Sequence, residues 1–274
     1  MAAALASLEF SSGERKSGRR LINAALRDPT ENAVAQAEFE AQRSRFEIPI
    51  SPVDVPGSHE ARTRDLAEHA EWQAALFAAD HWRADQAFDP DAAIHLSYLA
   101  AVGTEDFQLS RDAARAGLVA SPRNPTLLNN LAFALANLGE LREAASLLDK
   151  AQDAGGLDAG DTITCTATSG LIAFRAGNLE RGRSLYREAF EFARKKELTG
   201  YAGLAAAYWL QEEARVTPVP DAKLVASVET AVRASGEASA RTVLDRAERM
   251  LGRPVATEPI AAEKNRPQGR IADS

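Results

Sequence analysis

Cysteine, aromatic residues and long apolar runs are all scarce in this chain of 274 residues. The single cysteine, Cys165, excludes an intrachain disulfide, and the lack of a CxxC pair argues against cysteine-bound zinc and thiol exchange. No stretch reaches the roughly 20 apolar residues of a membrane span, and residues 1–10 lack the basic start and the apolar length of a secretory signal. We therefore expect a soluble cytoplasmic protein.

Basic residues are outnumbered, and this limits the partners that we expect. The chain has 32 Lys and Arg against 39 Asp and Glu, a formal charge of −7, and a pI near 5.3. Such a charge repels phosphate backbones and anionic lipids, so we expect neither nucleic acid nor membrane as a partner. The basic runs GERKSGRR and FARKKE are short and lie beside acidic residues, and we interpret them as solvated helix faces.

Alanine is what the chain has in abundance, and it favours helices. There are 56 alanines, whereas aromatic residues make up only 6% of the chain. This composition suits closely packed helices better than strands, which prefer β-branched and aromatic residues.

A short amphipathic helix followed by a turn recurs along the sequence. The turn positions are spaced by 35, 34 and 38 residues, at Ala70, Glu105, Gly139 and Gly177. The clearest copy is NPTLLNNLAFALANLGELREAASLLDKA, in which apolar residues follow at spacings of three and four on both sides of Gly139. Pairs of helices joined by a turn indicate a helical repeat, so we predict an all-α fold.

This copy resembles the tetratricopeptide repeat (TPR), a helix-turn-helix unit of 34 residues with small residues where its two helices meet. With Pro125 as the first position, Ala132, Ala144 and Ala151 take the small positions and Gly139 takes the turn. Leu128 stands where the family often has Trp, and in the preceding copy Tyr98 replaces the usual small residue. The resemblance implies a right-handed α-solenoid whose concave groove is lined by the first helix of each pair.

The segments outside the clearest copies divide the chain into five regions. We expect TPR-like N-terminal helices over 1–44, with Thr30 capping the helix that ends near Ser44. Three prolines predict an extended connector over 45–57, packed through Phe46, Ile48 and Ile50. A TPR array is expected over 58–196, TPR-like and capping helices over 197–251, and a disordered tail over 252–274, where Pro, Gly and charge occur without periodicity.

Residues capable of catalysis do not form a recognisable constellation in the sequence. His59 and Glu60 begin an HExxH motif, but Thr63 stands where the second histidine would be. His69 and His81 lie near several carboxylates, which we interpret as a solvated helix face, and Cys165 is expected to pack in a helix of small residues. Phosphate-binding patterns and a GxSxG motif are missing. We therefore expect no enzyme, no metal and no cofactor.

The TPR register also predicts which side chains face the groove. The second, fifth, ninth and twelfth positions of the first helices are apolar or neutral polar, with His95 the only titratable group, which suits contact with a peptide or a partner helix. Asn129 and Asn130 could bond to a bound peptide backbone, or only locally. The lysines and arginines of a carboxylate clamp are not found at these positions. The expected partner-binding residues are His95, Leu99, Asn129, Asn130, Phe133, Thr164, Leu171 and Phe174.

Two functions remain open from the sequence, and one alternative could cancel both. The first is a non-catalytic scaffold that binds a partner protein or peptide in the groove, with Leu99, Phe133 and Leu171 in one row. The second is a regulatory or peptide-sensing segment of a larger bacterial-type signalling or defence protein, because residue 1 falls almost at the start of a helix pair. The N-terminal helices or the connector could instead fold back into the groove and leave nothing to bind.

Overall fold

The computed structural model of the chain describes residues 2–27 and 29–253, and these residues form helices joined by turns and irregular loops, with no strand among them. The prediction of an all-α fold is confirmed for this part of the chain. The helices are α1 (Ala2–Ser11), α2 (Arg15–Ala25), α3 (Glu31–Ser44), the short 3-10 helix η1 (Pro52–Asp54), α4 (His59–Glu68), α5 (Trp72–Asp85), α6 (Pro90–Thr104), α7 (Phe107–Ala120), α8 (Pro125–Asn137), α9 (Leu141–Ala154), α10 (Ala159–Arg175), α11 (Leu179–Lys195), α12 (Thr199–Val216), α13 (Ala222–Ser235) and α14 (Ala238–Met250).

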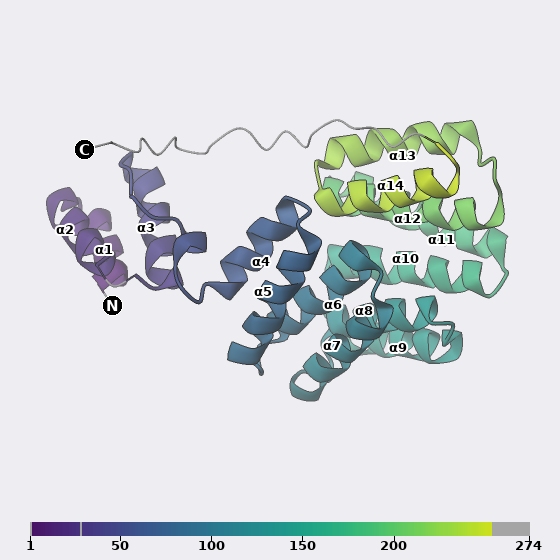
Figure 1. The fold of residues 1–274 in the computed structure, drawn as a ribbon, viewed down its shortest axis with the longest axis horizontal. Helices are drawn as coiled ribbons and strands as arrows, with labels where there is room; N and C mark the ends of the chain where they lie inside the picture. Colours follow the sequence, from purple (N-terminus) through teal and green to yellow (C-terminus); the bar gives the residue numbers. More distant parts are fainter. Residues whose placement is uncertain (1, 28, 254–274) are drawn as a thin grey trace.

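Helices α1 to α3 pack on one another around their own small core (Figure 1). Ala6, Ile22 and Ala37 are fully or almost fully buried there. The ring of Phe10 covers Gly18, where a Cβ would come within 2.9 Å of it. Thr30 caps α3, as predicted, by accepting a hydrogen bond of 3.3 Å from the Ala33 amide.

The segment between α3 and α4 is not helical except for η1. Phe46 and Ile48 pack against the core of α1 to α3, and Phe46 stacks on Phe10 with 5.7 Å between ring centroids. The prolines explain why the chain stays extended here, since each removes a backbone donor that a helix would need. The predicted tail lies outside the described residues, apart from Gly252 and Arg253, which follow the end of α14.

From α4 onward the helices pack pairwise, each against the next (Figure 1). Pairs α4/α5, α6/α7, α8/α9 and α10/α11 are each closed by one of the turns that recur in the sequence. All four turn residues have positive φ: 59° at Ala70, 55° at Glu105, 88° at Gly139 and 82° at Gly177. A left-handed residue therefore reverses the chain in every pair, and glycine occupies it twice.

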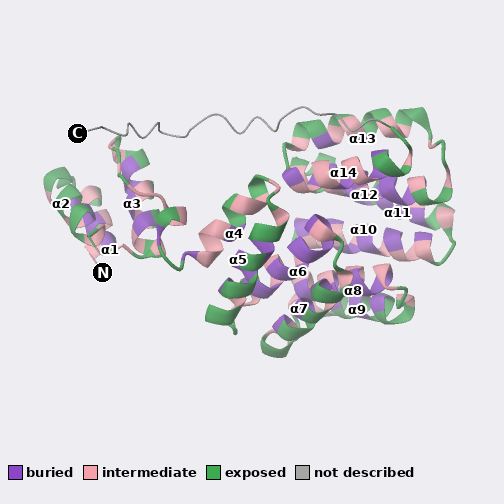
Figure 2. Cartoon of the chain, viewed as in Figure 1, coloured by how far each residue is buried: buried purple, intermediate pink, exposed green. Residues whose placement is uncertain are grey.

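Helices with neighbours on both sides carry more of the buried residues of the array than the helix at its edge does. Figure 2 shows buried residues along α10 and α12, whereas α13 is largely exposed at the edge. One buried cluster joins α8, α9 and α10, and a second joins α10 and α11 to α12, α13 and α14. Helix α12 therefore lies between the repeats and the terminal helices.

Candidate functional site

Helix α12 is the element that organises the interior of the array. It packs against α10, α11, α13 and α14, and α14 also reaches α6 and α4. Phe133 on α8 contacts Tyr208 on α12 with 5.1 Å between ring centroids. The face on which we predicted a groove is therefore covered by the chain itself. The segment that covers it is α12, not the N-terminal helices or the connector.

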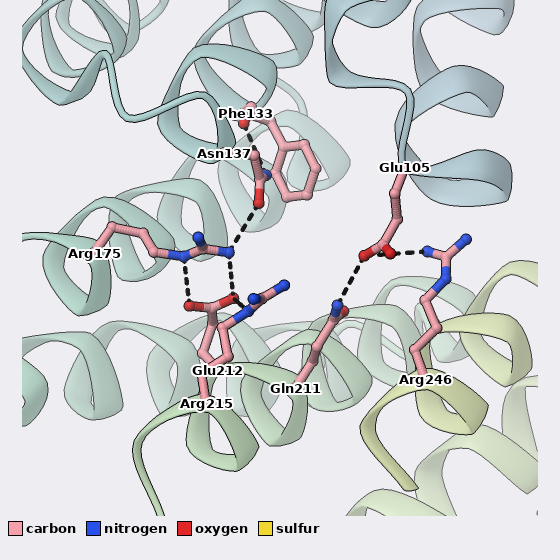
Figure 3. Close-up of polar contacts among 8 residues, drawn as sticks. All are labelled: Glu105, Phe133, Asn137, Arg175, Gln211, Glu212, Arg215 and Arg246. Carbon is pink, nitrogen blue, oxygen red and sulfur yellow. Dashed lines mark hydrogen bonds and ion pairs between the residues drawn. The ribbon is translucent and has the colours of Figure 1, made fainter. Parts of the chain in front are cut away.

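Two buried glutamates near the C-terminal end of α12 form ion pairs with arginines of the repeat helices α10 and α11. The Glu212 carboxylate accepts two hydrogen bonds from Arg175, at 2.8 and 3.0 Å, and a third at 3.2 Å from Arg215 (Figure 3). Arg175 also donates to Asn137 Oδ1 on α8 at 3.0 Å. Since the Glu212 side chain is only 4% exposed, these partners are needed to offset its desolvation.

The neighbouring carboxylate, Glu213, is held in the same way from the other side. Arg183 donates to both of its oxygens at 2.7 and 2.9 Å, and Trp209 Nε1 donates to Oε1 at 3.2 Å. The bonds to Glu213 and Glu180 raise the pKa of the Arg183 guanidinium, so this arginine stays charged. These two buried pairs fix the rotation of α12 about its axis.

A third set of contacts joins α12 and α14 to the turn between α6 and α7. Gln211 Nε2 donates to Glu105 Oε1 at 3.0 Å, and Arg246 Nη2 donates to the Gly103 carbonyl at 2.6 Å (Figure 3 draws Gln211, Glu105 and Arg246). Arg246 also lies 3.9 Å from the Glu105 carboxylate. Residues more than one hundred positions apart are thereby brought together, and the array closes on itself.

Inside this closure lies a cavity of about 80 Å³ between α6, α7, α8, α10, α11 and α12. Most of its surface is apolar. It is lined by Ser97, Tyr98, Ala101, Val102, Ser110, Asn129, Asn130, Phe133, Ile163, Thr164, Ala167, Thr168, Tyr186, Tyr201, Leu204, Ala205 and Tyr208. We call it the luminal cavity.

The tyrosines of the luminal cavity are neutral at physiological pH. Burial raises the pKa of Tyr98 to about 12 and also raises the pKa values of Tyr186, Tyr201 and Tyr208. No Asp, Glu, Lys, Arg or His is among the lining residues. The luminal cavity is therefore an uncharged site.

Four of the eight predicted partner-binding residues line the luminal cavity: Asn129, Asn130, Phe133 and Thr164. Asn130 is already engaged within the chain, since its Nδ2 donates to Ser97 Oγ at 2.9 Å and lies 3.4 Å from the Ile94 carbonyl. Thr164 Oγ1 donates to the Asp161 carbonyl at 3.1 Å. Asn129 is 6% exposed, and its carbonyl oxygen is buried without a hydrogen-bond partner among the described residues.

The other four lie elsewhere, and this corrects the predicted row of Leu99, Phe133 and Leu171. Leu99 is buried in a cluster with α5 and α7, and Leu171 and Phe174 are buried in the cluster around α8 and α9. His95 is partly buried against Trp82, with 5.1 Å between ring centroids. The physical reason is that a helix in a stack has apolar neighbours on several sides, so an apolar stripe alone does not show which neighbour it faces.

Groups that could carry chemistry are dispersed. His69 and His81 each bond through Nδ1 to a carbonyl of their own helix, at 2.8 and 2.9 Å. No group of three or more His, Cys, Asp or Glu side chains suited to a metal ion occurs in residues 2–27 and 29–253. Cys165 is buried, and burial raises the pKa of its thiol to about 11, so the reactive thiolate is disfavoured.

The sequence analysis missed Tyr208, Ser110 and the whole of α12 as parts of this site. One signal was present: Tyr98 interrupts the small-residue pattern of the repeat, and it packs against the cluster that contains α12 and α14. A second such signal is the polar run Gln211, Glu212 and Glu213, which directly follows an apolar stretch.

None of the described helices has the length and apolar character needed to cross a membrane. A scan against protein-family models finds no match for this chain, and a search of curated proteins finds no similar sequence. The resemblance to the TPR therefore rests on the recurring residues and on the helix pairs with their left-handed turns.

Proposed function

We propose that this chain is a non-catalytic interaction protein, a TPR-like right-handed solenoid that binds a partner protein on its outer face. The luminal side, where TPR arrays commonly hold a peptide, is covered here by α12. We therefore propose that a partner protein uses another surface.

The observation that supports this proposal is a hollow of about 520 Å³ between α5, α6 and α7. Two large apolar side chains at its edge are open to solvent: Phe77 is 69% exposed and Leu109 is 36% exposed. The Phe77 ring contacts the His81 ring, with 4.2 Å between the two centroids. Exposed aromatic side chains beside a hollow are typical anchors of protein interfaces.

The charges around the hollow indicate the kind of partner. Asp80, which also pairs with Arg83 at 2.8 Å, and Asp106, which caps α7, lie on its lining, and the chain carries a net charge of −7. A segment with one apolar side chain for the hollow and a basic residue beside it would match both features. We therefore propose an amphipathic, basic partner segment.

Affinity capture with three baits tests the proposal: the natural chain, Phe77→Ala and Phe39→Ala. Phe39 is the matched control, because it is 57% exposed but lies on α3, away from the hollow. We expect one stoichiometric partner that is retained by the natural chain and by Phe39→Ala and is lost from Phe77→Ala. An equal melting temperature for the three baits must accompany this result. A partner that Phe77→Ala also retains, or no stoichiometric partner at all, would contradict the proposal.

A further inference from the structure

Three buried side-chain polar atoms that lack a hydrogen-bond partner among the described residues line the luminal cavity, and five more lie elsewhere, on Glu40, Gln211, Asp245 and Arg246. Ser110 Oγ, Asn129 Oδ1 and Tyr208 OH are each buried and have no hydrogen-bond partner among the described residues. All three side chains line the same cavity. Ser110 is 0% exposed and Asn129 is 6% exposed, so bulk solvent does not satisfy them.

Such a concentration is costly for a structure that serves packing alone. A buried polar group without a partner destabilises a protein, and apolar residues of similar shape would remove that penalty. The neighbouring Asn130 shows the contrast, because its amide bonds to Ser97. Three unsatisfied groups around one cavity therefore indicate a molecule that supplies the missing bonds.

We infer that the luminal cavity binds a small uncharged molecule with a primary amide on a short aliphatic chain. The amide offers two N–H donors and one carbonyl acceptor. Asn129 Oδ1 can accept from the amide nitrogen, and the hydroxyls of Tyr208 and Ser110 can donate to the carbonyl or accept from the second N–H. The apolar remainder of the lining then contacts the aliphatic chain.

Charge and size narrow the ligand further. The lining has no ionised group, so a carboxylate or an ammonium would lose its hydration without gaining a counter-charge. A cavity of about 150 Å³ holds benzene, so the luminal cavity of about 80 Å³ suits a smaller molecule. Tyr201, which is 41% exposed, belongs to the lining and marks the side from which the ligand enters.

Three molecules of nearly the same shape test this inference: propionamide, butanone and propionate. They differ only in whether an amino group, a methyl group or a charged oxygen stands beside the carbonyl. We expect propionamide to cause saturable amide shifts in NMR spectra of the full chain, at residues of α7, α8 and α12 that line the cavity. Butanone should bind at least tenfold more weakly, and propionate should cause no saturable shift.

Two variants provide the matched test on the protein. Asn129→Leu keeps the size of the side chain and removes its amide, and Ser110→Ala removes one hydroxyl. Both should keep or raise the melting temperature of the free protein while weakening propionamide binding at least fivefold. Asn32→Leu, at an exposed position of α3, is the control and should bind like the natural chain.

Several results would overturn the inference. The first is the lack of a saturable shift with propionamide, which would leave water as the only occupant. The second is binding of butanone or propionate that is as strong as the binding of propionamide. Unchanged propionamide binding by both Asn129→Leu and Ser110→Ala would do the same. None of these results depends on the outer hollow, so a failure here is distinct from a failure of the proposed partner site.

Discussion

Phe133 and Tyr208 meet edge to face across the lumen of the array, with ring centroids 5.1 Å apart and an interplanar angle of 66°. Phe133 belongs to the first helix of the clearest repeat, and Tyr208 lies near the middle of α12. The repeat pattern predicts that Phe133 faces an open groove, but in the structure its ring packs against α12 in the interior. Through this pair, α12 covers the face of α8 that an open array of helix pairs would leave exposed.

The first prediction concerns the stability of that contact. Phe133→Ala should lower the free energy of unfolding by about 3 kcal/mol, because the change removes ring contacts and enlarges the luminal cavity. Phe77→Ala, at a 69% exposed position, should change the free energy of unfolding by no more than about 0.5 kcal/mol. Urea unfolding of both variants checks the difference. A loss for Phe133→Ala as small as that for Phe77→Ala would show that the ring does not stabilise the interior.

The sequence was sufficient for the parts of the fold that depend on local interactions. The caps, the left-handed turns and the helix pairs each depend on residues within a few positions, as Thr30 and Gly139 illustrate. The neighbour that an apolar stripe faces was harder to predict, because Leu99 would be apolar whether it packed against α5 or lined a groove. Successive residues on a helix point about 100° apart, so a small error in register moves a side chain to another neighbour.

The contacts that close the array could not be predicted from the sequence, and the reason is a different one. It depends on pairs such as Arg246 with Gly103 and Gln211 with Glu105, which are far apart in the sequence. Single charged residues of this kind have no periodic pattern and look like solvated positions. The two asparagines show the same limit, since Asn129 and Asn130 are adjacent and identical in the sequence. Only the packing of α6 distinguishes them, by giving Asn130 a partner in Ser97.

The second prediction uses the left-handed turns. Ala70 has a φ of 59°, which costs a residue with a Cβ about 1 kcal/mol or more relative to glycine. Ala70→Gly should therefore raise the free energy of unfolding by about 1 kcal/mol. Gly139→Ala should lower it by about 1 to 2 kcal/mol, although a Cβ at Gly139 would meet no atom within 4 Å. Denaturant unfolding measures both. Changes of the same sign would show that backbone conformation is not the deciding factor.

The third prediction separates buried from exposed ion pairs. Glu212→Gln should lower the free energy of unfolding by about 3 kcal/mol, since it leaves Arg175 and Arg215 facing each other without a counter-charge. Glu60→Gln is the control, because Glu60 pairs with Arg64 at the surface, where the side chains are 39% and 48% exposed. It should cost less than about 1 kcal/mol. Equal losses in urea unfolding would contradict the structural role assigned to Glu212.

The last prediction concerns pH and His95. Burial lowers the pKa of this imidazole below its ordinary value of 6.5, and the backbone bond to Asp91 opposes the shift only in part. As the pH falls through about 6.5, the unfolded chain takes up a proton at His95 before the folded chain does, so protonation favours unfolding. The stability contributed by neutral His95 is therefore present above about pH 6.5 and declines as the pH falls toward the lower pKa of the folded state. Unfolding measured from about pH 7.5 to 5.5 should show this decline in the natural chain and a flatter profile in His95→Gln. An NMR titration of the His95 ring in the folded protein provides the direct check, and a midpoint at or above 6.5 would refute the assignment.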